Sequence, residues 1–379
     1  MLGTCLFILQ IIMETDTINL QGTITSIAPG RTCLFGDHQD YLGLPVIACA
    51  IDRYVTLEAV PNNLNVFRLD MADIGEVRVI GVGEAFPNLA PRDYFASSLR
   101  VLGRYGCIPD RGYDITVRGN IPINSGTSSS SALLLAWINF LIRAFGIRGE
   151  VGPELLSVLG HASEVVEHGE PGGMMDHFSI GVGNIVHITT SKPYSFKVIG
   201  TRLDGLITGV SGVPKETVGL LSRVKGSALA ALDTVSTNFS DFDLHTATLD
   251  DMRRFKSCLK ADATPYFEAA IKNHHYTGEA LKEFEGGDPD PLRLGELMND
   301  HHAVLRDLLK ITVPRIDKMV DAALYAGAYG AKIVGSGGGG SIVVLAPPKA
   351  REQVCEALMG AGAKEAYGVN VDKGARIIN

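Results

Sequence analysis

A run of small residues and hydroxyls, Pro122-Ile-Asn-Ser-Gly-Thr-Ser-Ser-Ser-Ser-Ala132, leads directly into the apolar residues 133–145. Only Asn139 and Arg143 interrupt the apolar run, which stops at Gly146. A segment that is apolar on nearly every side is typical of a buried helix, and glycine is a common residue after a helix end. Free backbone N–H groups and the positive end of the dipole bind anions at a helix start. The run therefore predicts an anion site at the start of a core helix. A serine-rich linker is the alternative, although a flexible linker would not enter a buried helix directly.

The composition is that of a globular protein with room for more than one domain. The chain has 379 residues, of which 46% are hydrophobic and 20% charged, enough for two domains with substantial cores. The formal net charge is −8, and no long block of like charge occurs, which disfavours a nucleic-acid-binding surface. Any phosphate site must therefore be built locally, from backbone N–H groups and a few cations.

The cysteines and histidines do not form a recognisable metal or disulfide pattern. Six cysteines lie far apart, without a Cys-x-x-Cys pair, which favours buried thiols in a reducing compartment. The adjacent histidine pairs at 274–275 and 301–302 have no further Cys or His at a spacing suited to metal ligands. We interpret these histidines as surface or packing residues.

The N-terminal residues 2–13 are apolar but lack a charged leading segment and a clear cleavage site. They are also too short for a membrane span, which takes about 20 residues. We therefore expect a cytoplasmic protein without a membrane anchor. We further hypothesise that Met13 is the natural start, which the N-terminal mass of the native protein would test.

Charged residues gather on a loop near the start of the first predicted domain. Residues 28–43 carry Arg31, Asp37, His38 and Asp40 between predicted strands. Charged groups on a glycine-punctuated loop between buried strands are typical of a site, and a solvated turn is the alternative. The patterns of this half predict strands at 18–27, 46–51, 54–60, 67–82 and 113–118, and a helix at 93–105.

A second carboxylate-bearing segment follows the core helix. Residues 153–168 have the apolar spacing of a helix, which includes Glu164, and a glycine-rich loop then leads to Asp176. A carboxylate in partly apolar surroundings is suited to accepting a proton. The alternative is an Asp that caps a helix start. We expect strand structure at 180–188.

The second half of the chain is predicted to be mainly helical, with a glycine-rich turn. Residues 335–340 match Gly-x-Gly-x-x-Gly, but a dinucleotide fingerprint needs a helix directly afterwards, and a strand at 342–345 follows here. Two interpretations of the glycine run therefore remain: a tight turn between strands, or a stretch of backbone that lies close to a ligand. We expect a hairpin at 191–201, a domain boundary near residue 205, helices at 214–236, 249–271, 292–308, 313–328 and 350–361, and a strand at 366–372.

Three motifs, in this order and at these separations, resemble the GHMP kinases, the family of galactokinase, homoserine kinase, mevalonate kinase and phosphomevalonate kinase. Gly30-Arg-Thr-Cys-Leu-Phe-Gly-Asp-His-Gln-Asp-Tyr41 is similar to the galactokinase signature. Pro122-x-x-x-Gly-x-Ser-Ser-Ser130 looks like the ATP-phosphate loop, and Lys332-Ile-Val-Gly-Ser-Gly-Gly-Gly-Gly340 like the C-terminal glycine loop. The resemblance spans about residues 18–345.

The resemblance implies an α+β, two-domain GHMP kinase fold. The N-terminal domain, residues 14–205, would be ribosomal protein S5 domain 2-like and would carry the phosphate loop. The C-terminal domain, residues 206–379, would contain a ferredoxin-like α/β layer.

The resemblance also implies roles for individual residues. Asp176 would accept the proton of the substrate hydroxyl, and Arg31 would stabilise developing charge. Ser130 and Glu164 would hold Mg²⁺, which bridges the phosphates of ATP. The positions that match sugar-binding residues are Asp37, His38, Asp40, Gly173 and Asp176. Those that match ATP-binding residues are Pro122, Asn124, Ser125, Gly126, Thr127, Ser128, Ser129, Ser130, Gly335, Gly337 and Gly338.

Some positions depart from the galactokinase pattern. Asp37 stands where galactokinases have the longer Glu, and Cys33 stands in place of Asn. Thr127 and Ser131 replace the usual Leu and Ala of the phosphate loop. Residues 213–217 and 296–301 look more like mevalonate and heptose kinases.

The resemblance therefore implies an ATP-dependent kinase that phosphorylates a monosaccharide at its anomeric hydroxyl, with galactose as the first candidate. Mevalonate, a uronic acid, arabinose, N-acetylgalactosamine or a heptose is an alternative acceptor. A non-catalytic sugar sensor and a decarboxylase of the diphosphomevalonate type are the rivals of other classes. The expected partners are the sugar and ATP, without nucleic acid or membrane, for a monomer or homodimer.

Overall fold

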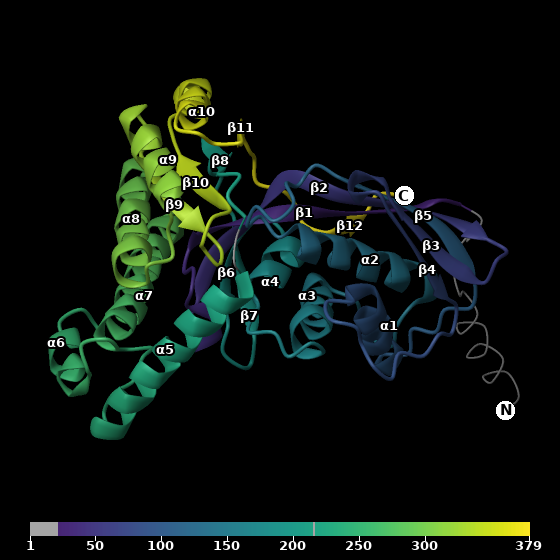
Figure 1. Cartoon of the computed structure of the whole chain (residues 1–379), viewed down its shortest axis with the longest axis horizontal. Coiled ribbons are helices and arrows are strands. Elements are labelled where there is room, and N and C mark those ends of the chain that lie inside the picture. The colour runs from purple at the N-terminus through teal and green to yellow at the C-terminus, as the bar shows by residue number, and fades with distance from the viewer. Residues whose placement is uncertain (1–21, 215–216) are drawn as a thin grey trace, which may run out of the picture.

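The computed structural model describes residues 22–214 and 217–379, which build two separate β-sheets and the helices packed on them (Figure 1). The N-terminal apolar stretch, the first residues of the predicted strand 18–27, and Lys215 and Glu216 lie outside the described residues. None of the described helices is long and apolar enough to span a bilayer.

The larger sheet contains eight strands. Its main path runs β12-β1-β2-β5-β3-β4, and β6 joins it by pairing with β2 and β7. Neighbours are antiparallel except β3 and β5, which are parallel. The strands are β1 (Ile24–Phe35), β2 (Val46–Asn62), β3 (Val66–Met71), β4 (Glu76–Gly81), β5 (Gly112–Gly119), β6 (Ile185–Thr189), β7 (Ser195–Ile199) and β12 (Arg376–Ile377).

The charged loop predicted at 28–43 is shorter than expected. Strand β1 continues to Phe35 because its second half pairs with residues 47–51 of β2. Arg31 therefore lies on a strand and not on a loop. The strands predicted separately at 46–51 and 54–60 form the single strand β2.

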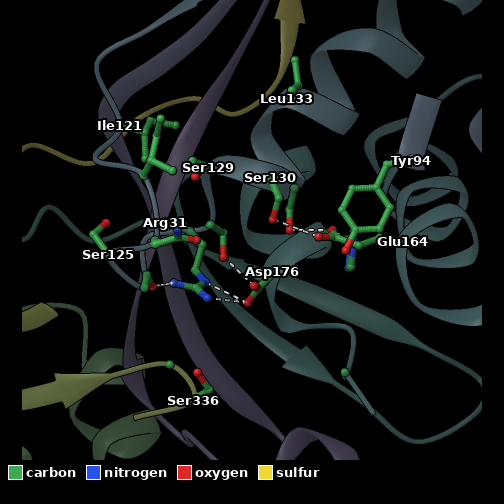
Figure 2. A pocket seen from close by; sticks show the side chains of 18 of the residues that line it. Arg31, Tyr94, Ile121, Ser125, Ser129, Ser130, Leu133, Glu164, Asp176 and Ser336 are labelled. Atoms are coloured by element: carbon green, nitrogen blue, oxygen red, sulfur yellow. Dashed lines mark hydrogen bonds and ion pairs between the residues drawn. The ribbon is translucent and has the colours of Figure 1, made fainter. Parts of the chain in front are cut away.

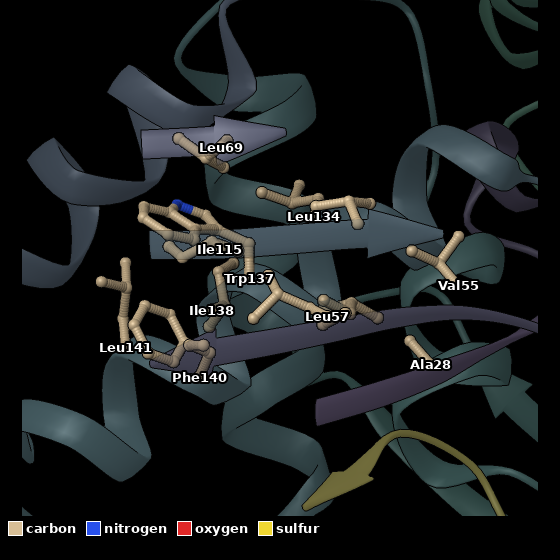
Figure 3. Packing of buried hydrophobic residues seen from close by; sticks show 14 of the residues in the cluster. Ala28, Val55, Leu57, Leu69, Ile115, Leu134, Trp137, Ile138, Phe140 and Leu141 are labelled. Atoms are coloured by element: carbon tan, nitrogen blue, oxygen red, sulfur yellow. The ribbon is translucent and has the colours of Figure 1, made fainter. Parts of the chain in front are cut away.

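The core of the larger unit lies between its sheet and α2 (Ser129–Phe145), the helix that the sequence predicts. Trp137 and Phe140 of α2 are fully buried and point toward the strands (Figure 3). Phe67 of β3 meets Trp137 edge to face, with ring centroids 5.3 Å apart, and the indole N–H donates to Ser98 Oγ at 2.8 Å. The polar tip of the tryptophan is thus satisfied inside an apolar core.

Three more helices pack around α2. Helix α1 (Tyr94–Arg104) agrees with prediction, and α3 (Pro153–His161) continues into a π-helical turn, Ala162–Val166. The expected strand at 180–188 is wrong in its first part, because Met175–Val182 forms helix α4 before β6 begins. Short apolar runs do not distinguish buried strands from buried helices, and Gly183, with φ of 71°, ends α4.

The smaller sheet has the strand order β11-β8-β10-β9, with every pair antiparallel. This is the expected ferredoxin-like order. Helices α8, α9 and α10 pack on the sheet (Figure 1). The elements are β8 (Leu206–Val210), α8 (Pro291–Ala303), α9 (Pro314–Tyr325), β9 (Gly330–Val334), β10 (Ser341–Leu345), α10 (Arg351–Gly360) and β11 (Glu365–Gly368).

The helix predicted at 249–271 is misplaced. The chain forms α5 (Thr217–Asn238), a short α6 (Met252–Phe255) and then α7 (Thr264–Glu285). Pro265 lies in the first turn of α7, where a missing N–H is harmless, whereas it would break the interior of a longer helix.

The larger unit contains residues from both ends of the chain, so a single boundary does not divide the two units. Strand β8 begins at Leu206, close to the expected boundary, but β12 at the C-terminal end pairs with β1 of the larger sheet. The division into 14–205 and 206–379 therefore stays a prediction.

Candidate active site

A cavity of about 450 Å³ lies at the start of α2 and reaches toward the turn between β9 and β10 (Figure 2). This volume is in the range of small-molecule sites. Most of the predicted site residues line it: Arg31, Asp37, His38, Asp40, Asn124, Ser125, Gly126, Ser128, Ser129, Ser130, Glu164, Gly173, Asp176 and Gly335. Pro122, Thr127, Gly337 and Gly338 are not among its lining residues.

The serine-rich loop has an unusual backbone before α2. Asn124, Gly126 and Ser128 all have positive φ, at 57°, 89° and 58°. Non-glycine residues in this region carry strain that persists mainly at functional sites. Alternating backbone of this kind, followed by a helix start, aims N–H groups at one place and binds anions. The loop and α2 thus agree with the predicted phosphate site.

The loop rests on the glycine turn of the smaller sheet. Ser341 Oγ donates to Ser125 O at 2.5 Å, and a Cβ on Gly340 would lie only 2.9 Å from the same oxygen. Gly337 and Gly338 face Ile311 instead of the cavity: a Cβ on Gly337 would meet Ile311 O at 2.6 Å, and Gly338 N donates to it at 2.7 Å. The geometry gives no support to a nucleotide contact by these two glycines.

Arg31 and Asp176 form the central ion pair. Arg31 Nε and Nη2 both donate to Asp176 Oδ1 at 2.8 Å, and Nη1 donates to Gly126 O. Ser128 Oγ donates to the other carboxylate oxygen. Burial alone would raise the pKa of Asp176, but Arg31 and Ser128 lower it below its ordinary value. Asp176 is therefore ionised at neutral pH, and one guanidinium ties it to the loop.

Asp40 and Gly173 form a second feature at the same end of the cavity. The Asp40 carboxylate lies so close to Gly173 that a Cβ there would overlap it. Burial, and then the charge of Asp176, raise the pKa of Asp40 to about 6. Two carboxylates thus converge, and Gly173 acts by making room for one of them. Such groups suit hydroxyl donors.

Asp37 and His38 line the cavity but are already bonded elsewhere. Asp37 is 1% exposed, and its carboxylate accepts from Lys332 Nζ and, at 2.7 Å, from Gly335 N. The two ring nitrogens of His38 lie 3.0 Å from the Tyr41 hydroxyl and 3.1 Å from Ser336 O. Their predicted contact with sugar hydroxyls stays a prediction. The sequence analysis missed Lys332 as a site residue, although a lysine inside an apolar strand beside a glycine run was a usable signal.

Glu164 lies on the π-helical turn, a feature frequent at functional sites. Its Oε1 accepts from Ser130 Oγ at 3.0 Å, and its Oε2 from Ser131 Oγ at 2.6 Å and His177 Nε2 at 2.9 Å (Figure 2). Burial would raise the pKa of Glu164, but His177 and Ser131 lower it. Sequence reasoning missed His177, which only the fold brings to Glu164.

The oxygen atoms of Ser130 and Glu164 fit Mg²⁺. This ion takes one or two protein oxygens and completes its shell with phosphate and water. Among residues 22–214 and 217–379 no cluster of three or more His, Cys, Asp or Glu could hold a metal by itself, so the ion would depend on a bound phosphate. Ser130 is exposed toward the cavity, and the second oxygen of Glu164 is fixed by Ser131 and His177.

The other end of the cavity is lined mainly by apolar side chains, with Asp73 and Arg118 beside them. It is lined by side chains from β2, β3, β5 and α2 that are far apart in the sequence, and no local motif marks them. The lining residues at this end include Val55, Met71, Val117, Ile121 and Leu133. This end suits a flat, largely apolar group such as a nucleobase.

Comparison with known proteins places the chain in a family of kinases. The model "GHMP kinases N terminal domain" matches residues 93–184, "GHMP kinases C terminal" matches 279–364, and "Galactokinase galactose-binding signature" matches 18–61. The chain belongs to the GHMP kinase family, which confirms the resemblance and the two-domain α+β fold class.

Individual relatives point to two branches of this family. The mevalonate kinase of Thermococcus gammatolerans is 26% identical over 351 residues, which cover 89% of this chain and 93% of that protein. Lactococcus lactis galactokinase complexed with galactose shares the fold with a TM-score of 0.83 at 23% identity, covering 94% and 95% of the two chains. Methanococcus jannaschii mevalonate kinase gives 0.71 at 20% identity, covering 93% and 99%.

Proposed function

We propose that the protein is an ATP-dependent kinase that transfers the γ-phosphoryl group to a hydroxyl of a neutral monosaccharide. Galactose is the first candidate, with its anomeric hydroxyl as the acceptor. The observation that carries the proposal is the pair of carboxylates, Asp40 and Asp176, at one end of the cavity.

The charge of this end favours an uncharged acceptor. Of the cavity-lining cations beside the carboxylates, Arg31 is paired with Asp176, and Arg92 with Glu170 at 3.0 Å. A carboxylate on mevalonate or on a uronic acid would face Asp40, and like charges close together repel each other. Lys225, whose Nζ donates to Pro171 O at 3.2 Å, is a nearby cation without an ion pair among the described residues, so the preference for an uncharged acceptor rests on the charge of Asp40. Hydroxyl groups can instead donate to both carboxylates, and a site of this kind rejects analogues that lack the hydroxyl.

The mechanism follows from the way the chain ties these groups together. The loop at 122–128 and the start of α2 hold the phosphates of ATP through backbone N–H groups. Ser130 and Glu164 would hold Mg²⁺, which would offset phosphate charge when bound. Asp176 orients the acceptor hydroxyl and takes its proton as the new O–P bond forms and the bond to the ADP oxygen breaks.

Asp176 acts here mainly by orientation. Its pKa is lowered, so it is a weak base, which suits phosphoryl transfer because that reaction relies on positioning and charge stabilisation. Arg31 holds Asp176 and the carbonyl of Gly126 at once, and so fixes the distance between the acceptor hydroxyl and the phosphates. The apolar end of the cavity would take the adenine base.

The test combines an acceptor screen with one substitution. ATP consumption would be measured with galactose, N-acetylgalactosamine, glucuronate, galacturonate, arabinose, fucose, heptoses and mevalonate. Asp176→Asn should abolish turnover with the best acceptor while Mg·ATP binding remains, whereas the exposed-site control Asp204→Asn should behave as the wild type. Wild-type-like turnover in Asp176→Asn would refute the role of this residue. If none of the acceptors supported ATP consumption, the result would favour a non-catalytic sugar sensor.

Mevalonate is the second candidate acceptor. The curated relatives at 25–27% identity are named mevalonate kinases, and residues 296–301 resemble that branch. Turnover with mevalonate but not with any neutral sugar would select this alternative.

A further inference from the structure

A fully buried ion pair at the wall of the cavity connects the two units. Lys332 of β9 is 0% exposed and Asp37, just after β1, is 1% exposed. Lys332 Nζ also donates to Cys33 O at 3.0 Å. Both oxygens of Asp37 are occupied, one by Lys332 and the other by the N–H of Gly335. With 1% exposure and a donor on each oxygen, this carboxylate offers a substrate almost no accessible surface.

The next residue makes a parallel connection. His38 has φ of 63°, and its Nε2 lies 3.1 Å from Ser336 O while Nδ1 meets the Tyr41 hydroxyl. Consecutive residues 37 and 38 thus hold consecutive residues 335 and 336. We call Asp37, His38 and Lys332 the clasp.

The clasp acts on the part of the glycine turn nearest the catalytic groups. A Cβ on Gly335 would lie 3.5 Å from Gly126 O and 3.8 Å from Arg31 Nη2. Gly126 O is also the acceptor for Arg31 Nη1. A displacement of Gly335 would therefore disturb the backbone that packs against Arg31 and Gly126 of the phosphate loop.

We propose that the clasp residues position the glycine turn, residues 335–340, beneath the phosphate loop, and that Asp37 and His38 do not bind the acceptor. The consequences for Mg·ADP binding and for kinetics rest on the proposed kinase function, whereas those for unfolding do not. The charge state agrees with it: burial would raise the pKa of Asp37, but Lys332 and the Gly335 N–H lower it. The Asp37 carboxylate is thus ionised, and Lys332 Nζ is bonded to it.

A double-substitution cycle tests the clasp. Removing one partner of a buried pair leaves an uncompensated charge, whereas removing both can be nearly neutral. Asp37→Asn and Lys332→Met should each lower the urea midpoint of unfolding and weaken Mg·ADP binding, measured by calorimetry. The variant carrying both changes should recover much of each loss. For residues of one network, the departure from additivity corresponds to roughly 2- to 150-fold in the Mg·ADP dissociation constant.

The rival is direct binding of the sugar by Asp37. In that case Asp37→Asn would raise the galactose KM alone, Lys332→Met would leave galactose and Mg·ADP unaffected, and the effects would add. That result would overturn the proposal. If a single variant fails to fold, folding of the double variant supports the clasp, and insolubility of the double beside a soluble Lys332→Met overturns it.

A control separates general destabilisation from the clasp. Asp372→Asn removes the partner of Arg376, 2.8 Å away, near the C-terminal end, and should lower the midpoint without changing Mg·ADP affinity. If galactose is not a substrate, the unfolding and Mg·ADP measurements still test whether the clasp positions the glycine turn. If the wild type does not bind Mg·ADP, the proposed function fails, while the unfolding cycle still tests the clasp.

Discussion

Asp40 has a half-buried carboxylate that lies near a second carboxylate, and this unfavourable position makes its replacement informative. Its carboxylate is placed against Gly173 and near Asp176, without a cation partner among the described residues. Asp40→Asn keeps the shape and removes the charge. We expect this variant to be more stable than the wild type and to bind the acceptor less well, since ligand sites commonly trade stability for function.

The size of the stability gain follows from the pKa. Burial, and then Asp176, raise the pKa of Asp40 from 3.8 to about 6, and each pKa unit corresponds to about 1.4 kcal/mol. The product is about 3 kcal/mol, an upper limit because the side chain is partly exposed to the cavity; we expect about 1–2 kcal/mol.

The pH dependence has a definite sign. The folded state holds the Asp40 proton more tightly than the unfolded state, so the wild type loses stability as the pH rises from about 4 to about 6. Asparagine does not titrate. The advantage of Asp40→Asn should thus be small at pH 4, grow up to pH 6 and remain constant above that.

Urea unfolding of both proteins at pH 4.5, 6.0 and 7.5 would measure this advantage, and the acceptor KM would be measured at pH 7.5. Asp204→Asn, at a side chain that is 50% exposed, is the matched control and should show no such trend. If Asp40→Asn were no more stable than the wild type at pH 7.5, the ionised Asp40 carboxylate would not lower the free energy of unfolding. That result would refute the reasoning.

Three other substitutions follow from the same geometry. Gly173→Ala should raise the acceptor KM because its methyl group overlaps the Asp40 carboxylate, and adding Asp40→Ala should relieve the overlap, seen as a recovered thermal midpoint but not a recovered KM. Ser131→Ala removes one of the donors that fix Glu164 and should weaken Mg²⁺ binding in the presence of ADP by about tenfold; an unchanged Mg²⁺ titration in calorimetry would contradict this. Arg31→Lys cannot make the forked contact with Asp176 and should lower kcat by about 100-fold in single-turnover assays, with little change in ATP affinity.

The sequence predicted the parts of the site that carry strong local signals. The serine-rich run before α2 needed no tertiary information, because its small residues and the apolar helix after it are adjacent in the chain. The glycine turn at 335–340 was likewise recognised as a turn between strands from the strand that follows it. The loop before Asp176 marked this residue as a candidate, although α4, Met175–Val182, overlaps the start of the strand predicted at 180–188.

The missed features depend on contacts between distant residues. Asp37 and Lys332 are 295 positions apart, and neither residue alone shows that its charge is compensated. His177 is adjacent to Asp176, yet its role depends on the π-helical turn that brings Glu164 within 2.9 Å. Strand β12 has only two residues, too few for a periodic pattern, and forms because β1 offers a free edge.

Hydrogen bonds join one group of cavity residues closely, whereas Asp40 lies outside that group. Arg31, Asp176, Ser128 and Gly126 are joined by hydrogen bonds to one another, so a change in any of them disturbs the others. The Asp40 carboxylate accepts from the N–H of Tyr41 at 2.9 Å, is also contacted by the backbone N–H of Met175, and lies beside Gly173 at the cavity. We expect a change at Asp40 or on the 169–173 loop to affect the choice of acceptor more than the binding of phosphate. We propose that Asp40 selects the acceptor in this chain, and an unchanged order of acceptors in Asp40→Asn would contradict this.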